Sequence, residues 1–295
     1  MSDVYVVEVF KSKQGGGNPA PIVIETAGLE AEQMMSIART YGHESGFVLP
    51  ATSGNDYRFR FFVPRHEMSM CGHATIGTVW LLHTLGKLDR RSLSIETLSG
   101  NVSVQIHGKE GEQPFIEISQ PAGVISPMPK PELRDQIIQA IGLESGDILD
   151  LPFLNSATSR VKTLIPVKTA ERLDAAVPDS ARIEALCEIQ DSTGLYLFCA
   201  NPGAPRQFDS RQFPKASGYP EDAATGIAAT ALAFGLLEYG MIKAESASIL
   251  IHQGRAMGRP SDIHVRLDLD DAGIPCGCFV GGYSALAPAG GLYEQ

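Results

Sequence analysis

Two short segments, about half a chain apart, carry residue types that can move protons. Residues 70–77 read Met-Cys-Gly-His-Ala-Thr-Ile-Gly, and residues 221–228 read Glu-Asp-Ala-Ala-Thr-Gly-Ile-Ala. Thiol, imidazole and carboxylate groups all serve as general acids or bases when they are positioned beside a substrate. The candidate catalytic groups here are Cys71, His73 and Asp222.

Each segment opens into a run of small and apolar residues that predicts a helix. The start of a helix exposes unpaired backbone N–H groups and about half a positive charge, so it holds an anion well. Two such ends that face one another would hold a small carboxylate. The backbone groups of Gly72, Thr225, Gly226 and Ile227 are the candidates for this binding.

Glu44 is a further candidate, at the expected junction of a helix and a short strand. A carboxylate before an apolar strand is usually solvated. If it faces a closed apolar site its pKa rises, and it becomes an acid or base that works near neutral pH.

The other candidates also have purely structural interpretations. Cys71 can be a small buried residue instead of an activated thiol, and Asp222 can be an ordinary helix cap. A tight turn predicted over residues 251–261 brings Gln253 or Arg259 towards the site, or only stabilises the second domain.

The elements that must position these groups follow one order twice. The first half predicts strand, strand, helix, strand, strand, helix, and the second half repeats it, which indicates a duplication and two similar domains. Breaker residues at 120–123 and 126–131 mark the boundary. We expect one domain over 1–122, completed by 279–295, and a second over 123–278. The predicted elements are 4–10, 20–25, 29–41, 46–49, 57–63 and 75–85, then 153–156, 161–166, 178–189, 195–200, 206–213 and 224–237.

Composition excludes several classes of protein. The chain has 295 residues, a net charge of −10 and no dense Lys/Arg run, which argues against nucleic-acid binding. We expect no membrane span and no signal peptide. Five cysteines without a framework spacing suit the cytoplasm, and the pair Cys276 and Cys278 favours a structural thiol over a metal site.

Six segments together resemble the PhzF-like (phenazine-biosynthesis) family of isomerases, relatives of diaminopimelate epimerase and proline racemase. They occur in the family's order and span nearly the whole chain. The chain departs from the family's Glu-Asp-Pro-Ala-Thr-Gly-Ser version at Ala223 and Ile227. The matching segments are 17–20, 44–48, 62–77, 221–226, 253–261 and 280–282.

The resemblance implies an α+β fold of two pseudo-symmetric domains, each a barrel-like β-sheet around a central helix, with a cleft between them. It implies a homodimer, no cofactor and no metal. Glu44 corresponds to the family's general acid/base, with Asp222 and His73 as its partners. Asn18, in the first matching segment, joins Gln253 among the expected substrate-binding residues.

The sequence therefore predicts a cofactor-independent isomerase that moves a carbon-bound proton on a small, amino-acid-like carboxylate. Three alternatives stay open. One is an epimerase in which Cys71 is one base. Another is hydrolysis by Cys71 with His73 as base, which residues two apart on a helix disfavour, since they do not face each other. The last is a carboxylate-binding protein without catalysis.

Overall fold

The computed structural model describes residues 3–109, 111–216 and 219–288. The chain divides into two compact units, Met1–Ser119 with Gly281–Gln295 (unit 1) and Gln120–Val280 (unit 2). The sequence analysis placed these boundaries after residues 122 and 278. Residues 289–295 of the expected closing segment lie outside the described residues.

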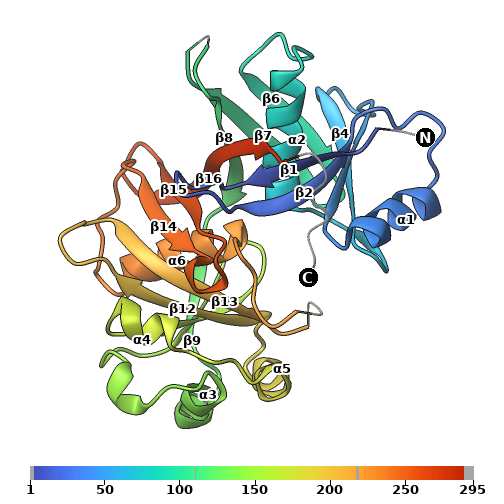
Figure 1. Ribbon diagram of the computed structural model, residues 1–295. Coiled ribbons are helices and arrows are strands. Elements are labelled where there is room, and N and C mark those ends of the chain that lie inside the picture. The colour runs from blue at the N-terminus through green and yellow to red at the C-terminus, as the bar shows by residue number, and fades with distance from the viewer. Residues whose placement is uncertain (1–2, 110, 217–218, 289–295) are drawn as a thin grey trace. The chain divides into compact units, whose positions relative to one another are not determined.

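Unit 1 is a closed barrel of eight strands (Figure 1). The strands pair in the order β1-β2-β3-β4-β6-β7-β8-β16, and pairing of β16 with β1 closes the ring. The short strand β5 (Glu67–Met68) pairs with β4. The barrel strands are β1 (Tyr5–Val9), β2 (Asn18–Val23), β3 (Ser45–Leu49), β4 (Tyr57–Phe62), β6 (Ser92–Thr97), β7 (Gly100–His107), β8 (Phe115–Pro121) and β16 (Pro275–Leu286).

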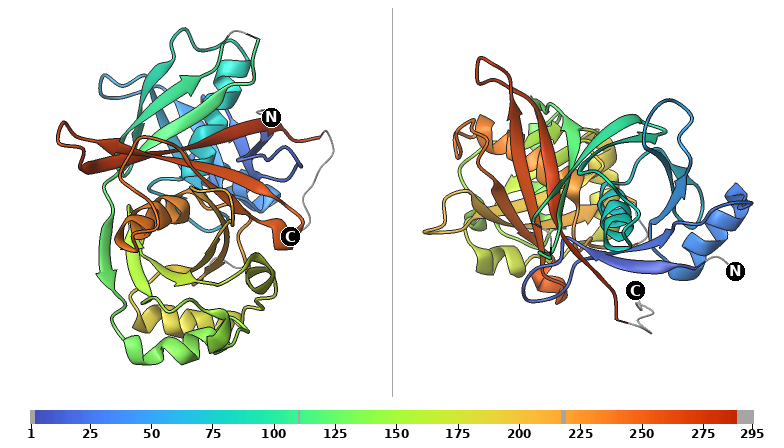
Figure 2. Two further views of the ribbon diagram at one scale, coloured as in Figure 1. Left: turned by 90° about the vertical axis from the view of Figure 1, so that its left-hand side faces the viewer. Right: turned by 90° about the horizontal axis from the view of Figure 1, so that it is seen from above.

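Helix α2 (Gly72–Thr84) runs through this barrel and is apolar on nearly all sides, as a helix enclosed by strands must be (Figure 2). Small residues allow the strands to pack close to it. A Cβ atom at Gly46 would lie 2.9 Å from Thr78 Oγ1, and one at Gly77 would lie 2.8 Å from Val9. Helix α1 (Ala31–Tyr41) covers the outer face, where Met34 packs among Val23, Ala38, Phe47 and Phe62.

Unit 2 repeats the plan around helix α6 (Gly226–Glu238), which packs on β9, β10, β11 and β15. Its strands pair in the order β16-β15-β14-β13-β12-β11-β10-β9. Gly235 allows close packing here, since a Cβ atom would lie 2.1 Å from Leu164. These strands are β9 (Val124–Pro127), β10 (Leu154–Ala157), β11 (Lys162–Pro166), β12 (Gly194–Ala200), β13 (Gln207–Pro214), β14 (Ile249–Gln253) and β15 (Ser261–Leu269).

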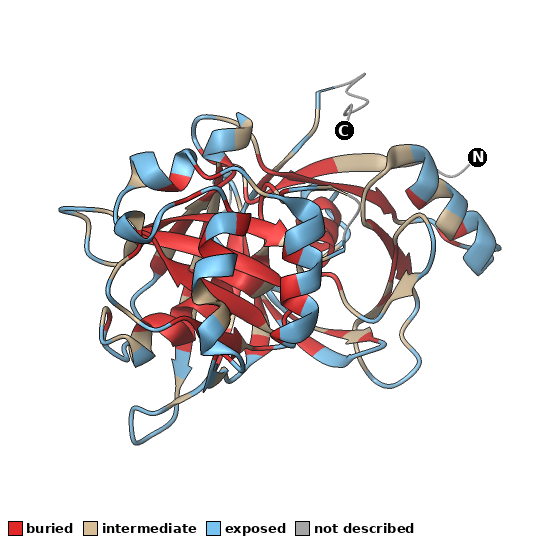
Figure 3. Ribbon diagram, turned by 90° about the horizontal axis from the view of Figure 1, so that it is seen from below, coloured by how far each residue is buried: buried red, intermediate tan, exposed pale blue. Residues whose placement is uncertain are grey.

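Three further helices cover the outer face of unit 2, and their outward sides are exposed while the strands beneath are buried (Figure 3). They enclose a core of 19 buried apolar residues, among them Ile165, Leu195, Leu197 and Phe213. These helices are α3 (Arg134–Ala140), α4 (Ala170–Asp174) and α5 (Ser180–Ile189), and the short 3₁₀ segments are η1 (Pro131–Leu133), η2 (Ser145–Asp147) and η3 (Arg255–Met257).

The stretch 120–131, which the sequence analysis interpreted as a boundary, contains the end of β8 and the whole of β9. Pro121 ends β8, and β9 runs from Val124 to Pro127. Strand β9 stands last in the pairing order of unit 2, where it pairs with β10 only. Proline is tolerated at a sheet edge because no partner there needs its missing N–H.

The predicted set of elements was incomplete. The sequence analysis did not assign the strands β5 to β9, β15 and β16 or the helices α3 and α4. Among the described residues, no helix has the length and apolar character that crossing a membrane requires.

Candidate active site

The first candidate segment forms the start of α2 in unit 1. Cys71 is the N-cap residue, with an extended backbone (φ −139°, ψ 110°), and the helix begins at Gly72. The Thr75 amide and hydroxyl both donate to the Cys71 carbonyl, at 3.0 and 2.8 Å, which fixes the first turn. Cys71 Sγ lies 3.4 Å from His73 Nδ1.

This contact corrects an argument made from the sequence. Residues two apart within a helix point in different directions, and on that ground Cys71 and His73 were judged an awkward pair. Cys71 stands outside the helix as its cap, so the helical rule does not apply to it. The thiol and the imidazole are within contact distance.

Glu44 reaches the same helix start from a different element. Helix α1 ends at Gly42, whose left-handed backbone (φ 70°) turns the chain into β3, and Glu44 directly precedes that strand. The close packing of Gly46 on α2 brings this turn alongside the helix. Glu44 Oε2 lies 3.9 Å from His73 Nε2, and the two side chains are 24% and 10% exposed.

His73 therefore lies between two groups, with the Cys71 thiol at one ring nitrogen and the Glu44 carboxylate at the other. A thiol, an imidazole and a carboxylate in this order can pass or share a proton. All three residues belong to unit 1.

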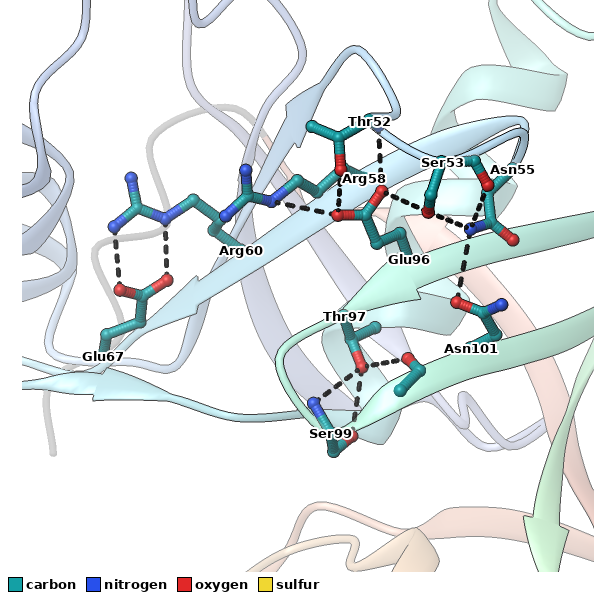
Figure 4. A network of polar contacts seen from close by, with 11 residues as sticks. Thr52, Ser53, Asn55, Arg58, Arg60, Glu67, Glu96, Thr97, Ser99 and Asn101 are labelled. Atoms are coloured by element: carbon teal, nitrogen blue, oxygen red, sulfur yellow. Dashed lines mark hydrogen bonds and ion pairs between the residues drawn. The ribbon is translucent and has the colours of Figure 1, made fainter.

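Two sets of polar contacts fix the loop that leads into Cys71. Figure 4 shows the Arg60–Glu67 pair and the Thr97–Ser99 contacts that belong to them. Arg60 on β4 donates two hydrogen bonds of 2.7 Å to the Glu67 carboxylate. The Ser99 amide donates to the Ser69 carbonyl at 3.1 Å, and Thr97 holds the Ser99 turn through its hydroxyl. These contacts hold the entry to α2 from two neighbouring parts of the barrel.

Asn18, the other predicted site residue of unit 1, begins β2 and is 7% exposed. It pairs with Val9 across the β1–β2 ladder. Its part in substrate binding stays a prediction.

The second candidate segment forms the start of α6 in unit 2. Thr225 is the N-cap residue, and the helix begins at Gly226, followed by Ile227. The Thr225 hydroxyl donates to the Asp222 carboxylate. The Asp222 amide donates to the Gln212 carbonyl at 3.1 Å, which joins this turn to β13.

Gln253 holds the Asp222–Thr225 turn in place. Its Nε2 donates to the Asp222 carbonyl at 2.7 Å and to Thr225 Oγ1 at 3.2 Å. Its Oε1 accepts from the Thr225 amide at 3.3 Å and from the Tyr196 hydroxyl at 3.0 Å. The amide is thus occupied within unit 2, and direct binding of substrate by Gln253 stays a prediction.

The turn predicted after Gln253 is present and packs against the same segment. Gly254 has φ 80°, and a Cβ atom there would lie 2.7 Å from the Ala223 carbonyl oxygen. Only glycine fits so close an approach with this backbone.

A buried ion pair, which the sequence analysis did not identify, anchors the segment from the other side. Arg211 on β13 donates to both Glu221 oxygens, at 2.9 and 2.6 Å, and both side chains are 8% exposed. Arg211 Nη1 also donates to three carbonyl oxygens at the end of α4, those of Leu173, Asp174 and Ala176. A charged residue within a predicted strand, residues 206–213, was the available sequence signal.

The remaining cysteine pair lies on β16. Cys276 is exposed and contacts the Asp268 carbonyl at 3.5 Å, whereas Cys278 is buried and burial raises the pKa of its thiol to about 12. Within the described part of the chain, no group of three or more His, Cys, Asp or Glu side chains could hold a metal ion.

Comparison with known proteins identifies the family. The family model described as "Phenazine biosynthesis-like protein" matches residues 7–282. The chain belongs to this family. The resemblance drawn from the six sequence segments is thereby confirmed.

Relatives of the phenazine biosynthesis-like family give the class of activity. An uncharacterized isomerase, YddE, of Escherichia coli K12 is 31% identical over 271 residues, 91% of each chain. The trans-2,3-dihydro-3-hydroxyanthranilate isomerase of Pseudomonas aeruginosa is 31% identical over 264 residues, 89% of each chain. The protein is an isomerase.

The fold agrees with that of a solved family member. The Bacillus anthracis phenazine biosynthesis protein of the PhzF family has a TM-score of 0.88 and 27% identity, over 97% of both chains. The expected α+β fold, with barrel-like sheets around central helices, is confirmed.

Proposed function

We propose that this isomerase moves a carbon-bound proton on a small carboxylate-bearing, amino-acid-like metabolite, with Glu44 as general acid/base. The observation that carries the proposal is the contact of 3.9 Å between Glu44 Oε2 and His73 Nε2 at the start of α2. A carboxylate in a partly buried position beside an imidazole can take up and return a proton at neutral pH.

In this proposal the substrate carboxylate binds to helix N-termini. Gly72 at the start of α2 and Thr225, Gly226 and Ile227 at the start of α6 supply backbone N–H groups. Asp222 belongs to the segment that precedes the start of α6. The helix ends then stabilise the negative charge that develops on an enolate-like intermediate.

The proton balance needs no further reactant. The Glu44 carboxylate removes a proton from carbon and becomes a carboxylic acid, while the C–H electron pair enters the conjugated system of the substrate. The same proton then returns to another carbon, and a double bond shifts. His73 donates to the developing negative charge, and Asp222 assists. No electron is gained or lost, so we propose a cofactor-independent reaction.

A second candidate, epimerisation, is favoured by one observation. Cys71 Sγ lies 3.4 Å from His73 Nδ1, so the imidazole can accept the thiol proton and leave a thiolate base. The proton would then return to the same carbon from the opposite face. The second segment carries Asp222 and no cysteine, which disfavours a symmetric pair of thiols.

Exchange in D₂O tests both candidates. A panel of small carboxylates, including 2-amino acids and unsaturated hydroxy acids, is incubated with the protein and followed by NMR. A shifted double bond with deuterium supports isomerisation, and deuterium at an inverted centre supports epimerisation. Glu44→Gln abolishes either exchange, whereas the exposed control Glu32→Gln keeps it. Full exchange by Glu44→Gln, or binding without any exchange by the wild type, overturns the proposal.

We also propose that the protein is a cytoplasmic homodimer. The cysteines are all free thiols, which fits a reducing compartment. Light scattering after gel filtration tests the dimer, and fractionation of the source cells tests the location.

A further inference from the structure

The interior of unit 2 near the start of α6 is lined by polar side chains. On β12 and β13, alternate residues face the outer apolar core, among them Leu195, Leu197 and Phe213. The residues between them face inward, because side chains alternate along a strand. Tyr196 and Ser210 lie on this inner face and hydrogen-bond each other at 2.9 Å.

Lys162 belongs to the same inner surface. It pairs with Ser156 across the β10–β11 ladder, and the Ser156 hydroxyl donates to the Ala231 carbonyl of α6. Leu164, two residues along β11, packs on Gly235 of α6. Lys162 therefore points towards the central helix, and it is 4% exposed.

Lys162 as a whole residue is buried, and its amine has no hydrogen-bonding partner in the described part of the chain. No hydrogen bond or ion pair engages it among residues 3–109, 111–216 and 219–288. Burial lowers the pKa of Lys162 to about 8, and the Asp222 carboxylate partly opposes that shift. Asp222 is thus the opposite charge that Lys162 experiences most strongly.

Gln212 lies on β13, which β12 separates from the strand of Lys162, and its side-chain amide is buried and unpaired. It is 1% exposed, and neither Nε2 nor Oε1 of its side chain hydrogen-bonds a described residue. Its amide lies over Gly194, where a Cβ atom would come within 2.3 Å of Gln212 Nε2. Gly194 directly precedes Leu195, whose β11 partner is Thr163, so the Gln212 amide lies beside the strand that carries Lys162.

These two groups contrast with Gln253, whose amide makes four hydrogen bonds in the same interior. Buried polar groups are normally satisfied, because leaving them unpaired costs folding free energy. The buried, unpaired Gln212 amide, with the Lys162 amine on the same inner surface, points to a ligand.

We propose that Lys162 and Gln212 form a substrate subsite beside Asp222 that takes a neutral hydroxyl or carboxamide group of the substrate. The inference rests on the proposed function, in which helix N-termini hold the substrate carboxylate. Lys162 and Asp222 balance in charge, so a second carboxylate is not favoured there. A hydroxyl or carboxamide accepts from Lys162 and both donates to and accepts from the Gln212 amide.

Matched ligands test the subsite directly. Calorimetric titration compares L-homoserine with L-2-aminobutyrate, which lacks its hydroxyl, and L-glutamine with L-norvaline, which lacks its carboxamide. In at least one pair the polar member binds the wild type about tenfold tighter or more. Lys162→Met and Gln212→Met remove this preference and leave the affinity of the apolar member within about twofold. Equal affinities within both pairs, or a preference that survives both substitutions, overturn the subsite.

A second measurement needs no ligand. If the Lys162 amine does not serve the fold, Lys162→Met unfolds at a higher urea concentration than the wild type. The exposed control Lys168→Met removes one charge elsewhere on unit 2 and does not raise the midpoint. A lower midpoint for Lys162→Met shows that the amine stabilises the fold and overturns the subsite. Neither result depends on Glu44, so failure of the proposed function, seen with Glu44→Gln in D₂O, remains distinguishable.

Discussion

The thiol of Cys71 and the imidazole of His73 lie 3.4 Å apart, although the two residues are separated by only one position in the chain. The contact exists because the N-cap backbone of Cys71 is extended while His73 is already helical. Glu44 approaches the other ring nitrogen of His73, at 3.9 Å, so the three groups gather at the start of α2.

The contact leads to a prediction that distinguishes the role of Cys71 from the role of Glu44 in proton exchange. If Glu44 is the base, Cys71→Ala keeps proton exchange within about tenfold of the wild type, whereas Glu44→Gln loses about 10²–10⁴-fold. Deuterium incorporation measured by NMR at one pH checks both variants. The reverse order, with Cys71→Ala the more damaging change, would identify the thiol as the base and favour epimerisation.

The buried ion pair of Arg211 and Glu221 is expected to be critical for stability. Glu221→Gln leaves the Arg211 charge buried without its partner, and breaking a pair of this kind costs about 3–5 kcal/mol in the free energy of unfolding. The matched control is Glu188→Gln, which breaks the exposed pair with Lys215 and costs about 1 kcal/mol or less. Urea unfolding measures both, and equal losses would contradict the prediction.

The turn after Gln253 offers a controlled test of backbone packing. Gly254→Ala adds a Cβ atom 2.3 Å from the Arg259 carbonyl oxygen and 2.7 Å from that of Ala223. Gly258→Ala in the same turn has a similar positive φ but open space around it. We expect a loss of about 1–2 kcal/mol for Gly258→Ala from conformation alone, and a larger loss for Gly254→Ala.

Proton exchange gives the second readout for this turn. Gly254→Ala displaces the Ala223 carbonyl and with it the neighbouring Asp222 and Thr225, so exchange activity falls as well as stability. Gly258→Ala keeps the activity of the wild type at a temperature where both variants are folded. Equal activity of the two variants would show that the turn does not position Asp222.

The lowered pKa of Lys162 predicts that the stability of the folded protein changes with pH in a specific range. Its pKa is lowered from 10.5 to about 8 in the folded protein, so between these values the unfolded chain binds more protons. Stability therefore rises with pH from about 8 to about 10.5, by about 3 kcal/mol from this group. Below pH 8 both states are protonated, and the full cost of burial remains.

Comparison of wild type and Lys162→Met isolates that contribution, because Asp222, Arg160 and Cys187, the other groups acting on Lys162, are present in both. The stability advantage of the methionine variant shrinks as pH rises through this window. An advantage that stays constant from pH 7.5 to about pH 10.5 would show that the folded lysine titrates normally.

The local sequence predicted the parts of the fold that depend on neighbours in the chain. Helices apolar on all sides, such as α2 and α6, must be buried, and the family resemblance implied that they are the central helices. The segments around Glu44, Cys71 and Asp222 were identified as candidates from residue type and from family resemblance.

Other features depended on partners distant in the chain. The edge position of β9, which explains why Pro127 is tolerated there, follows from pairing in the sheet. Lys162 and Gln212 each stand in a strand, and only the barrel decides that both face the inside of unit 2.

The sequence by itself determined which groups can carry protons and which helix ends can hold an anion, because residue type and local helix signals are properties of short segments. The tertiary structure alone decided that His73 lies between Cys71 and Glu44. It also decided that Gln253 is hydrogen-bonded, whereas the Gln212 amide has no partner among the described residues. Hydrogen bonding and burial arise from contacts between strands and helices far apart in the chain, and no local pattern encodes them.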